Sequence, residues 1–222
     1  MKDILTLIST GIGVVDILET IIHEERSDIQ IRNIVDDSVI SEIASNGNVI
    51  PPSVVRRIAT YCQFAEDIGS RAVLITCSSI SEIVDLSKPF VHIPLFKIDE
   101  PMAELAVTRS HDSIAIVATL ETTMLPTRRL VEAKAAAAGK QLKITEELCI
   151  GAFEARMRGD YQKHDQIVLT AVKNIVKHCD IVLLAQVSMA RVIEGVSDPL
   201  IKDRVLTSPK IGIQRALEAL TG

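Results

Sequence analysis

Cys77 is the residue of this sequence best placed for acid–base or nucleophilic chemistry. It follows the apolar run Ala72–Thr76 and precedes Ser79-Ile80-Ser81-Glu82, an S-x-x-E pattern typical of a helix start. A thiol just before a helix faces unpaired backbone N–H groups and the positive end of the helix dipole, and both favour the thiolate. The same N–H groups would bind a substrate carboxylate. We therefore expect an ionised, reactive Cys77, and the alternative is a buried, inert cysteine.

Neutral hydrogen-bond donors follow this apolar run and the similar ones elsewhere in the chain. Such groups bind carboxylate oxygens without adding charge, and hydroxyls equally often cap helices, so both roles stay open. The candidate substrate-binding residues are Ser9, Thr10, Ser78, Ser79, Thr119, Thr122, Thr123, Gln186 and Ser188.

The other chemistry-bearing residues predict no metal or nucleotide site. Cys62, Cys149 and Cys179 lie away from the predicted strand ends, and we interpret them as buried thiols without a chemical role. The cysteines form no C-x-x-C pair and the five histidines no H-E-x-x-H, so no metal is expected. Gly11-x-Gly13 lacks the third glycine of a dinucleotide fingerprint, because Asp16 stands there.

The apolar runs that must position these residues occur twice in the chain, and the same number of residues separates the two copies of each run. A single shift of the sequence against itself superposes Ala72–Ile80 on Ile181–Met189, and Ile4–Thr10 on Ser113–Thr119. Short, almost continuously apolar, β-branched runs are typical of parallel strands that are buried on both faces. The sequence therefore predicts two copies of one plan.

Segments with a helical period alternate with these runs, which favours parallel sheets with right-handed crossovers. The segments are Gly13–Glu25, Ser53–Ile68, Met102–Arg109, Pro126–Ala138, Asp165–Lys177 and Ile211–Leu220. We expect an α/β protein with a first lobe of residues 1–98, completed by a C-terminal helix within 205–222, and a second lobe of residues 99–204. Ligands of such sheets bind at the carboxyl ends of the strands, so a cleft between two facing lobes is expected to hold the substrate.

The composition excludes several classes of protein. Of 222 residues, 47% are hydrophobic and 24% charged, which is enough for a sizeable core. With 29 acidic against 24 basic residues, two Tyr and no Trp, the chain lacks the basic surface and stacking aromatics of a nucleic-acid binder. No apolar run reaches the roughly 18 residues that a membrane-spanning helix needs. The N-terminal residues do not read as a signal peptide, and we expect a cytoplasmic protein.

Several segments also occur in a characteristic order. They are Asn33–Ser38, Thr76-Cys77-Ser78-Ser79, Ile98–Ala103, Val117–Thr123 and the strand that matches Ala72–Ile80 in the second half. In this order they resemble the aspartate/glutamate/hydantoin racemase superfamily over nearly the whole chain. The resemblance implies two pseudo-symmetric flavodoxin-like lobes, each a parallel sheet flanked by helices, with the active-site cleft between them. It also implies catalysis without cofactor or metal, a small carboxylate substrate and a homodimer.

The resemblance assigns catalysis to Cys77. The usual racemases of this superfamily use two cysteines, one from each repeat, to remove and return the Cα proton from opposite faces. Cys77 matches the first position, whereas Gln186 stands at the second. Because glutamine exchanges no proton near neutral pH, we expect no symmetric two-cysteine racemisation and interpret Gln186 as a hydrogen-bond donor.

The leading hypothesis is a cofactor-independent racemase/isomerase-type enzyme that acts beside the carboxylate of a small acid or amino acid. The superfamily also contains single-cysteine decarboxylases, where a thiol protonates the enediolate left by loss of CO2, and cis–trans isomerases, where a thiolate adds to an alkene diacid. A non-catalytic protein that binds small carboxylates is an alternative from another class. An oxidoreductase or a flavin protein of similar topology has the least support, since the chain has no glycine fingerprint and few aromatics.

Overall fold

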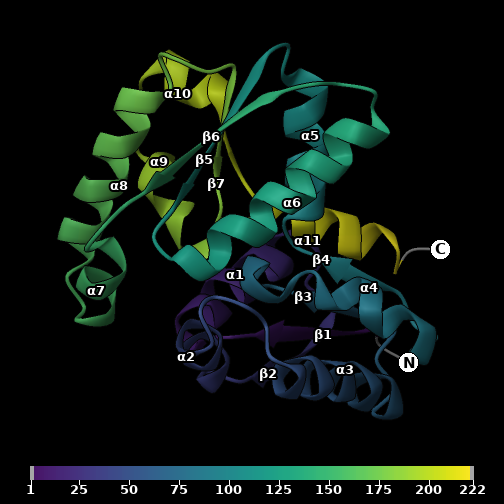
Figure 1. The fold of residues 1–222 in the computed structure, drawn as a ribbon. Coiled ribbons are helices and arrows are strands. Elements are labelled where there is room, and N and C mark those ends of the chain that lie inside the picture. The colour runs from purple at the N-terminus through teal and green to yellow at the C-terminus, as the bar shows by residue number, and fades with distance from the viewer. Residues whose placement is uncertain (1–2, 221–222) are drawn as a thin grey trace. The chain divides into compact units, whose positions relative to one another are not determined.

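The computed structural model describes residues 3–220 and consists of two compact α/β units (Figure 1). Unit 1 runs through the described residues to Glu100 and takes in the segment that begins at Pro209, and unit 2 is Pro101–Ser208. Residues 1, 2, 221 and 222, which the expected first lobe includes, lie outside the described residues.

Unit 1 contains a four-stranded parallel sheet with strand order β2-β1-β3-β4. Its strands are β1 (Ile4–Ser9), β2 (Gln30–Val35), β3 (Ala72–Ile75) and β4 (Leu95–Lys97). The central strands β1 and β3 are almost wholly buried, while the edge strand β2 is largely exposed. Ile8 pairs with Ile34 on one side and with Ile75 on the other, so the carboxyl ends of these three strands lie side by side.

Helices connect the strands of unit 1 and cover its sheet. They are η1 (Ile12–Val14), α1 (Val15–Glu25), α2 (Ser38–Ser45), α3 (Pro52–Asp67), η2 (Ser78–Ile80), α4 (Ile83–Ser87), η3 (Lys88–Phe90) and α11 (Pro209–Glu218), where η marks a 3₁₀ turn. Helix α3 begins after Pro51, with Pro52 in its first turn, because proline lacks only an N–H that no helical carbonyl would accept there.

Unit 2 repeats this arrangement with strand order β6-β5-β7-β8, again all parallel. Its strands are β5 (Ser113–Ala118), β6 (Lys143–Leu148), β7 (Ile181–Leu184) and β8 (Val205–Thr207). Its helices are α5 (Glu100–Arg109), α6 (Glu121–Ala137), α7 (Ala152–Met157), α8 (Tyr161–Ile175), η4 (Val187–Met189), α9 (Arg191–Glu194) and α10 (Pro199–Arg204).

The predicted fold class is confirmed, and the repeat offset holds for strands, turns and helices alike. Strand β1 begins at Ile4 and β5 at Ser113, and the same interval separates the starts of β3 and β7, of η2 and η4, and of α5 and α11. Each unit therefore builds the same strand, turn and helix around its own core.

Helix α11 returns to unit 1, where it contacts α1, β3 and β4. It approaches the sheet so tightly at Gly212 that an added Cβ would overlap the backbone carbonyl of Ile98. Only glycine allows the helix backbone to come this close to the end of β4.

Helix α6 begins earlier than the sequence predicts. We expected a start at Pro126, yet Pro126 lies inside a helix that begins at Glu121. Proline near the start of a helix removes a single backbone hydrogen bond, which the rest of this long helix outweighs. The correction matters for the site, because it places Thr122 and Thr123 in the first helical turn.

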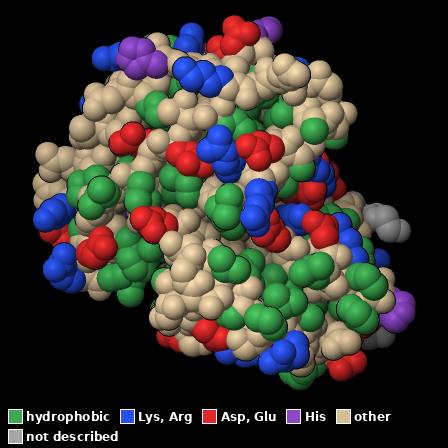
Figure 2. Space-filling view, viewed as in Figure 1, with side chains coloured by type: hydrophobic (Ala, Val, Ile, Leu, Met, Phe, Trp, Pro, Cys, Tyr) green, Lys and Arg blue, Asp and Glu red, His purple; other side chains and the backbone are tan. Residues whose placement is uncertain are grey.

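Most large apolar side chains are buried in one core per unit. Exceptions in unit 1 include Phe64, Leu86 and Phe90 on α3, α4 and η3, which are more than half exposed. Figure 2 shows apolar side chains gathered over this part of unit 1. None of the candidate site residues belongs to this surface.

Candidate active site

The first group of candidate residues lies at the carboxyl ends of β1 and β3 in unit 1. Ser9 ends β1, Thr10 follows it, and Cys77 follows β3 at the position directly before η2. The parallel register brings these strand ends together, so that the Thr10 hydroxyl hydrogen bonds to the Cys77 sulfur although the two residues are far apart in the sequence. The structure thus assembles Ser9, Thr10, Cys77, Ser78 and Ser79 into one cluster.

The Cys77 thiol is held in its protonated form, contrary to our expectation. The side chain is half-buried, and burial raises the pKa of the Cys77 thiol above its usual value. Hydrogen bonds with Thr10 and with the backbone and hydroxyl of Ser79 act in the opposite direction but do not reverse the shift of the pKa. The sulfur therefore carries a proton at neutral pH.

The helix start that the sequence predicts at Ser79 is wrong, and this explains why we expected an ionised Cys77. Ser79 lies inside η2, a single 3₁₀ turn, and α4 is only five residues long, with no side-chain cap on either. The N–H groups of Ile80 and Ser81 are already bonded to the carbonyl oxygens of Cys77 and Ser78. So short an element has a weak dipole and few unpaired N–H groups, too little to offset the burial of a thiolate.

Ser9 has a structural partner in the next strand. Its hydroxyl is almost wholly buried and hydrogen bonds to the hydroxyl of Thr76 (2.8 Å), which in turn donates to the carbonyl oxygen of Ile8 (3.2 Å). This chain of bonds uses the single O–H donor of each hydroxyl and ties β1 to β3. Among the candidates at this sheet edge, Thr10 is the better placed to meet a ligand, since its side chain is half-buried rather than enclosed.

The second group of candidate residues lies at the corresponding end of the sheet in unit 2. Gln186 stands directly before η4 with φ −133° and ψ 139°, close to the φ −127° and ψ 119° of Cys77 before η2. Glutamine thus occupies the backbone position that carries the thiol in unit 1.

The amide of Gln186 is oriented by Thr119. Its Oε1 accepts from the backbone N–H of Thr119 (2.6 Å) and from the Thr119 hydroxyl (2.9 Å). Because an N–H can only donate, the oxygen must face Thr119, and the NH2 group of Gln186 is left as the donor. Thr119 therefore orients the amide of Gln186, and donation from its NH2 group to a substrate stays a prediction.

The remaining candidates of unit 2 lie close to the same strand ends. Thr122 and Thr123 are buried in the first turn of α6, where the Thr123 carbonyl accepts from the hydroxyl of Thr127 (2.9 Å). Ser188 is buried within η4.

The other three cysteines are buried thiols, as predicted, but one of them was misplaced. Cys149 directly follows β6 at the same sheet edge as Gln186, although its side chain is only 3% exposed. Burial raises the pKa of Cys149 and that of Cys62 to about 11, and it also raises the pKa of Cys179. The sequence hid the position of Cys149 because β6 is a polar edge strand without an apolar run.

Sequence reasoning missed Asp99. This residue follows β4 by two positions, at the same end of the sheet as Cys77, and is fully buried. A signal was present, because an acid stands between the apolar stretch that ends at Ile98 and the helix that begins at Glu100.

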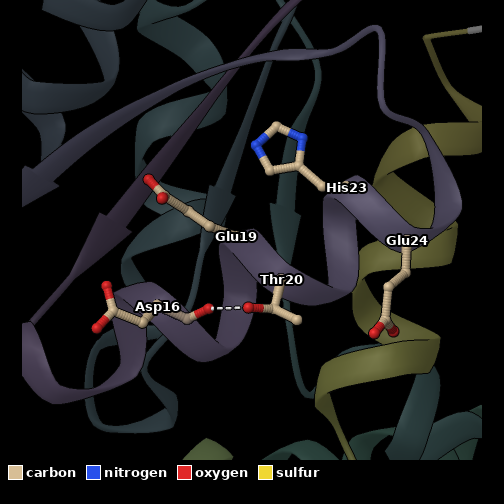
Figure 3. Close-up of a pocket in the computed structure, with 5 residues that line it drawn as sticks. All are labelled: Asp16, Glu19, Thr20, His23 and Glu24. Atoms are coloured by element: carbon tan, nitrogen blue, oxygen red, sulfur yellow. Dashed lines mark hydrogen bonds between the residues drawn. The ribbon is translucent and has the colours of Figure 1, made fainter.

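A separate hollow of about 500 Å³ lies over α1 in unit 1 and contains none of the candidate residues. Figure 3 shows its lining, where Thr20 donates to the backbone carbonyl of Asp16 (2.7 Å) and Glu19, His23 and Glu24 complete the surface. Among residues 3–220 no three His, Cys, Asp or Glu side chains are grouped as a metal site requires. We assign no role to this hollow.

Fold and site together define a class: enzymes with two repeated parallel α/β units and reactive groups at the carboxyl ends of their strands. The sequence profile of the Asp/Glu/Hydantoin racemase family matches residues 14–216, and the chain belongs to this family. Among curated proteins, no sequence matches significantly. In the described part of the chain, no helix combines the length and hydropathy that crossing a membrane requires.

Solved structures of racemases share the fold at low sequence identity. A glutamate racemase of Bacillus anthracis superposes with a TM-score of 0.71 at 15% identity, over 100% of this chain and 83% of that one. An aspartate racemase of Picrophilus torridus gives 0.70 at 12%, over 99% and 94%. An allantoin racemase of Klebsiella pneumoniae gives 0.66 at 12%, over 99% and 88%. At these identities the likeness establishes the two-lobed fold, and membership of the family supports a racemase/isomerase-type enzyme.

Proposed function

We propose that this protein is a cofactor-independent enzyme that moves a proton at the carbon beside the carboxylate of a small acid or amino acid, with Cys77 as its single catalytic thiol. The observation that carries the proposal is the equivalence of positions 77 and 186 in the two repeats. The same backbone site holds a protonated thiol in unit 1 and an oriented amide in unit 2. An arrangement with one thiol supports proton transfer from one side only.

The protonated state of Cys77 favours a role as a general acid. In the proposed step a group leaves the carbon beside the carboxylate without the bonding electrons, either as CO2 or as a proton taken up by water, and the electron pair stays on the substrate as an enediolate. The carbon then takes the proton from the Cys77 sulfur, and solvent reprotonates the thiolate that is left. Negative charge on the carboxylate oxygens grows before this transfer, so neutral donors that are already in place lower the barrier. We assign this role to Thr10, Ser78 and Ser79 in unit 1, and to Gln186 and the hydroxyls near it in unit 2.

A decarboxylase is the second candidate, and the same observation favours it. Loss of CO2 from a malonate-type diacid generates the enediolate directly, so that only an acid is needed and no second base. Thiol addition to an alkene diacid is less favoured, because it needs a thiolate whereas burial raises the pKa of Cys77.

The test of the proposed function is replacement of Cys77 and measurement of turnover on a panel of small acids. The panel holds amino acids, malonate-type diacids and alkene diacids. We expect Cys77→Ser to lower kcat by at least about 100-fold and Cys77→Ala to abolish turnover, since neither side chain supplies an acid of suitable strength. Cys62→Ser is the matched control, because it alters a buried thiol in α3 and is expected to leave kcat unchanged.

Deuterium oxide separates the reaction types. Racemisation places deuterium at Cα of both enantiomers, decarboxylation releases CO2 and places one deuteron in the product, and isomerisation by thiol addition incorporates none. Full activity in Cys77→Ala would refute the role of the thiol. Binding of an acid without turnover, unaffected by alkylation of Cys77, would instead support a non-catalytic carboxylate-binding protein.

A further inference from the structure

Asp99 carries a fully buried carboxyl group. Its side chain is 0% exposed, and neither carboxyl oxygen meets a donor at hydrogen-bonding geometry within the described residues. Burying an ionised carboxylate without partners is so costly that such a group retains its proton. Burial raises the pKa of Asp99 accordingly.

The groups around Asp99 lower its pKa by less than burial raises it. The Ser78 hydroxyl, the Asp99 backbone N–H, the Lys97 ammonium and the Ser81 hydroxyl all favour its ionised form. However, Lys97 already pairs with Asp85, and the Ser81 hydroxyl donates to the carbonyl oxygen of Ser78.

Asp99 and Cys77 leave the same edge of the sheet side by side: β3 and β4 pair with Ile75 opposite Lys97, and each acid stands two residues beyond that pair. A negative charge on Asp99 opposes loss of the proton from the Cys77 thiol, and Thr10 and Ser79 are the groups that favour its loss. Ser78, the neighbour of Cys77 in the chain, lies against the Asp99 carboxyl. The Cys77 thiol and the Asp99 carboxyl are therefore two neighbouring acids, and the charge on either one raises the pKa of the other.

The repeat offers an internal comparison. The shift that superposes Cys77 on Gln186 also superposes Asp99 on Ser208. Ser208 is also buried and stands directly before α11, as Asp99 stands directly before α5. The thiol and the buried acid thus occur together in unit 1, and in unit 2 both are replaced by side chains that do not titrate, those of Gln186 and Ser208.

Helix capping does not account for Asp99. Aspartate is common directly before a helix because its carboxylate accepts N–H groups of the first turn. The Asp99 oxygens accept none, although the residue stands at this position before α5. A role in the Cys77 site explains why an acid is retained at a fully buried position.

We propose that Asp99 is a positioning residue of Cys77. It is a buried acid beside η2 whose negative charge keeps the catalytic proton on the sulfur. The two acids behave as a coupled pair. The carboxyl releases its proton first, and the resulting buried charge opposes release of the second proton from the thiol. Cys77 consequently stays an acid over a wider range of pH than it would alone. This inference rests on the proposed function for its catalytic meaning.

The test is the pH dependence of Cys77 alkylation in the absence of substrate. Iodoacetamide reacts with the thiolate, and the modified Cys77 peptide is quantified by mass spectrometry from pH 6 to 11. We expect Asp99→Asn, which keeps the shape and removes the charge, to move the alkylation midpoint to lower pH by about one unit. Asp67→Asn, an exposed acid at the end of α3, is the matched control and is expected to leave the midpoint unchanged.

An unchanged midpoint in a folded Asp99→Asn protein would overturn the inference, and so would a midpoint at higher pH. Should Asp99→Asn fail to fold, Asp99→Ser introduces the residue found at the counterpart position 208 and is tested in the same way. Infrared spectroscopy of the wild-type protein gives an independent measurement, since a buried protonated carboxyl is expected near neutral pH and its absence would contradict the proposal. Because no turnover is measured, failure here leaves the proposed function standing, whereas an active Cys77→Ala enzyme would refute that function without altering the alkylation result.

Discussion

At the scale of single residues, the two units show how one backbone site can serve different chemistry. Cys77 and Gln186 have similar φ and ψ angles and both precede a 3₁₀ turn, yet one carries a proton and the other only hydrogen bonds. What distinguishes them is their surroundings. A hydroxyl and a backbone N–H orient Gln186, whereas burial and a nearby buried acid surround Cys77.

The orientation of Gln186 leads to a prediction with two variants. Gln186→Glu keeps an oxygen for Thr119 and removes the NH2 donor, so we expect a higher KM for a carboxylate substrate with little loss of stability. Gln186→Leu leaves the buried N–H of Thr119 without a partner and is expected to lower the free energy of unfolding by about 1–3 kcal/mol. Urea denaturation and steady-state kinetics measure the two effects. Equal KM values in Gln186→Glu and the wild type would exclude the donor role.

At the scale of elements, parallel pairing decides which residues meet. Strands β1, β3 and β4 end at one edge of their sheet, so residues that follow them at positions 10, 77 and 99 come together although the chain separates them. Helix α11 contributes by packing against β3 and β4 from the far end of the sequence. Its position depends on the absence of a side chain at Gly212.

Gly212→Ala tests this packing. An added methyl group would meet the carbonyl oxygen and the side chain of Ile98, the residue before Asp99, so α11 must move away from the sheet. We expect a loss of about 1–3 kcal/mol in the free energy of unfolding, as for other overpacked cores. Gly195→Ala is the matched control, because it has ordinary backbone angles and no atom within 4 Å of the added Cβ. Equal urea midpoints for the two variants would show that α11 does not need this close approach.

At the scale of the whole molecule, the four free cysteines report on the integrity of each unit. Cys62 lies in the core of unit 1, and Cys149 and Cys179 lie in that of unit 2, whereas Cys77 is half-buried at its sheet edge. Buried thiols with a raised pKa react slowly, because reagents need both access and thiolate.

Titration with an aromatic disulfide reagent at pH 8 should therefore modify one thiol in the native protein. We expect this reaction to be slower than that of free cysteine, since burial raises the pKa of Cys77, and we expect it to disappear in Cys77→Ala. All four thiols should react after unfolding in urea. Modification of two or more thiols in the native protein would contradict the assignment of the other three cysteines to the cores.

The amino-acid sequence was sufficient to predict the α/β class, the repeat and most of the central elements. Strands β1, β3, β5 and β7 are buried on both faces, so they must be continuously apolar, and that pattern is readable without coordinates. Strands β2 and β6 are exposed edges, and β4 and β8 are only three residues long, so none of them leaves such a pattern.

Only the tertiary structure decided the state of the candidate site. The sequence placed Cys77 after a strand, but whether its sulfur holds a proton depends on how deeply neighbouring elements bury it. Asp99 lies well beyond Cys77 along the chain and reaches the same loop only because β4 pairs with β3. Solvation and charge act through space, whereas sequence patterns report mainly on neighbours along the chain, and for that reason the thiol was expected to be ionised although the fold keeps its proton.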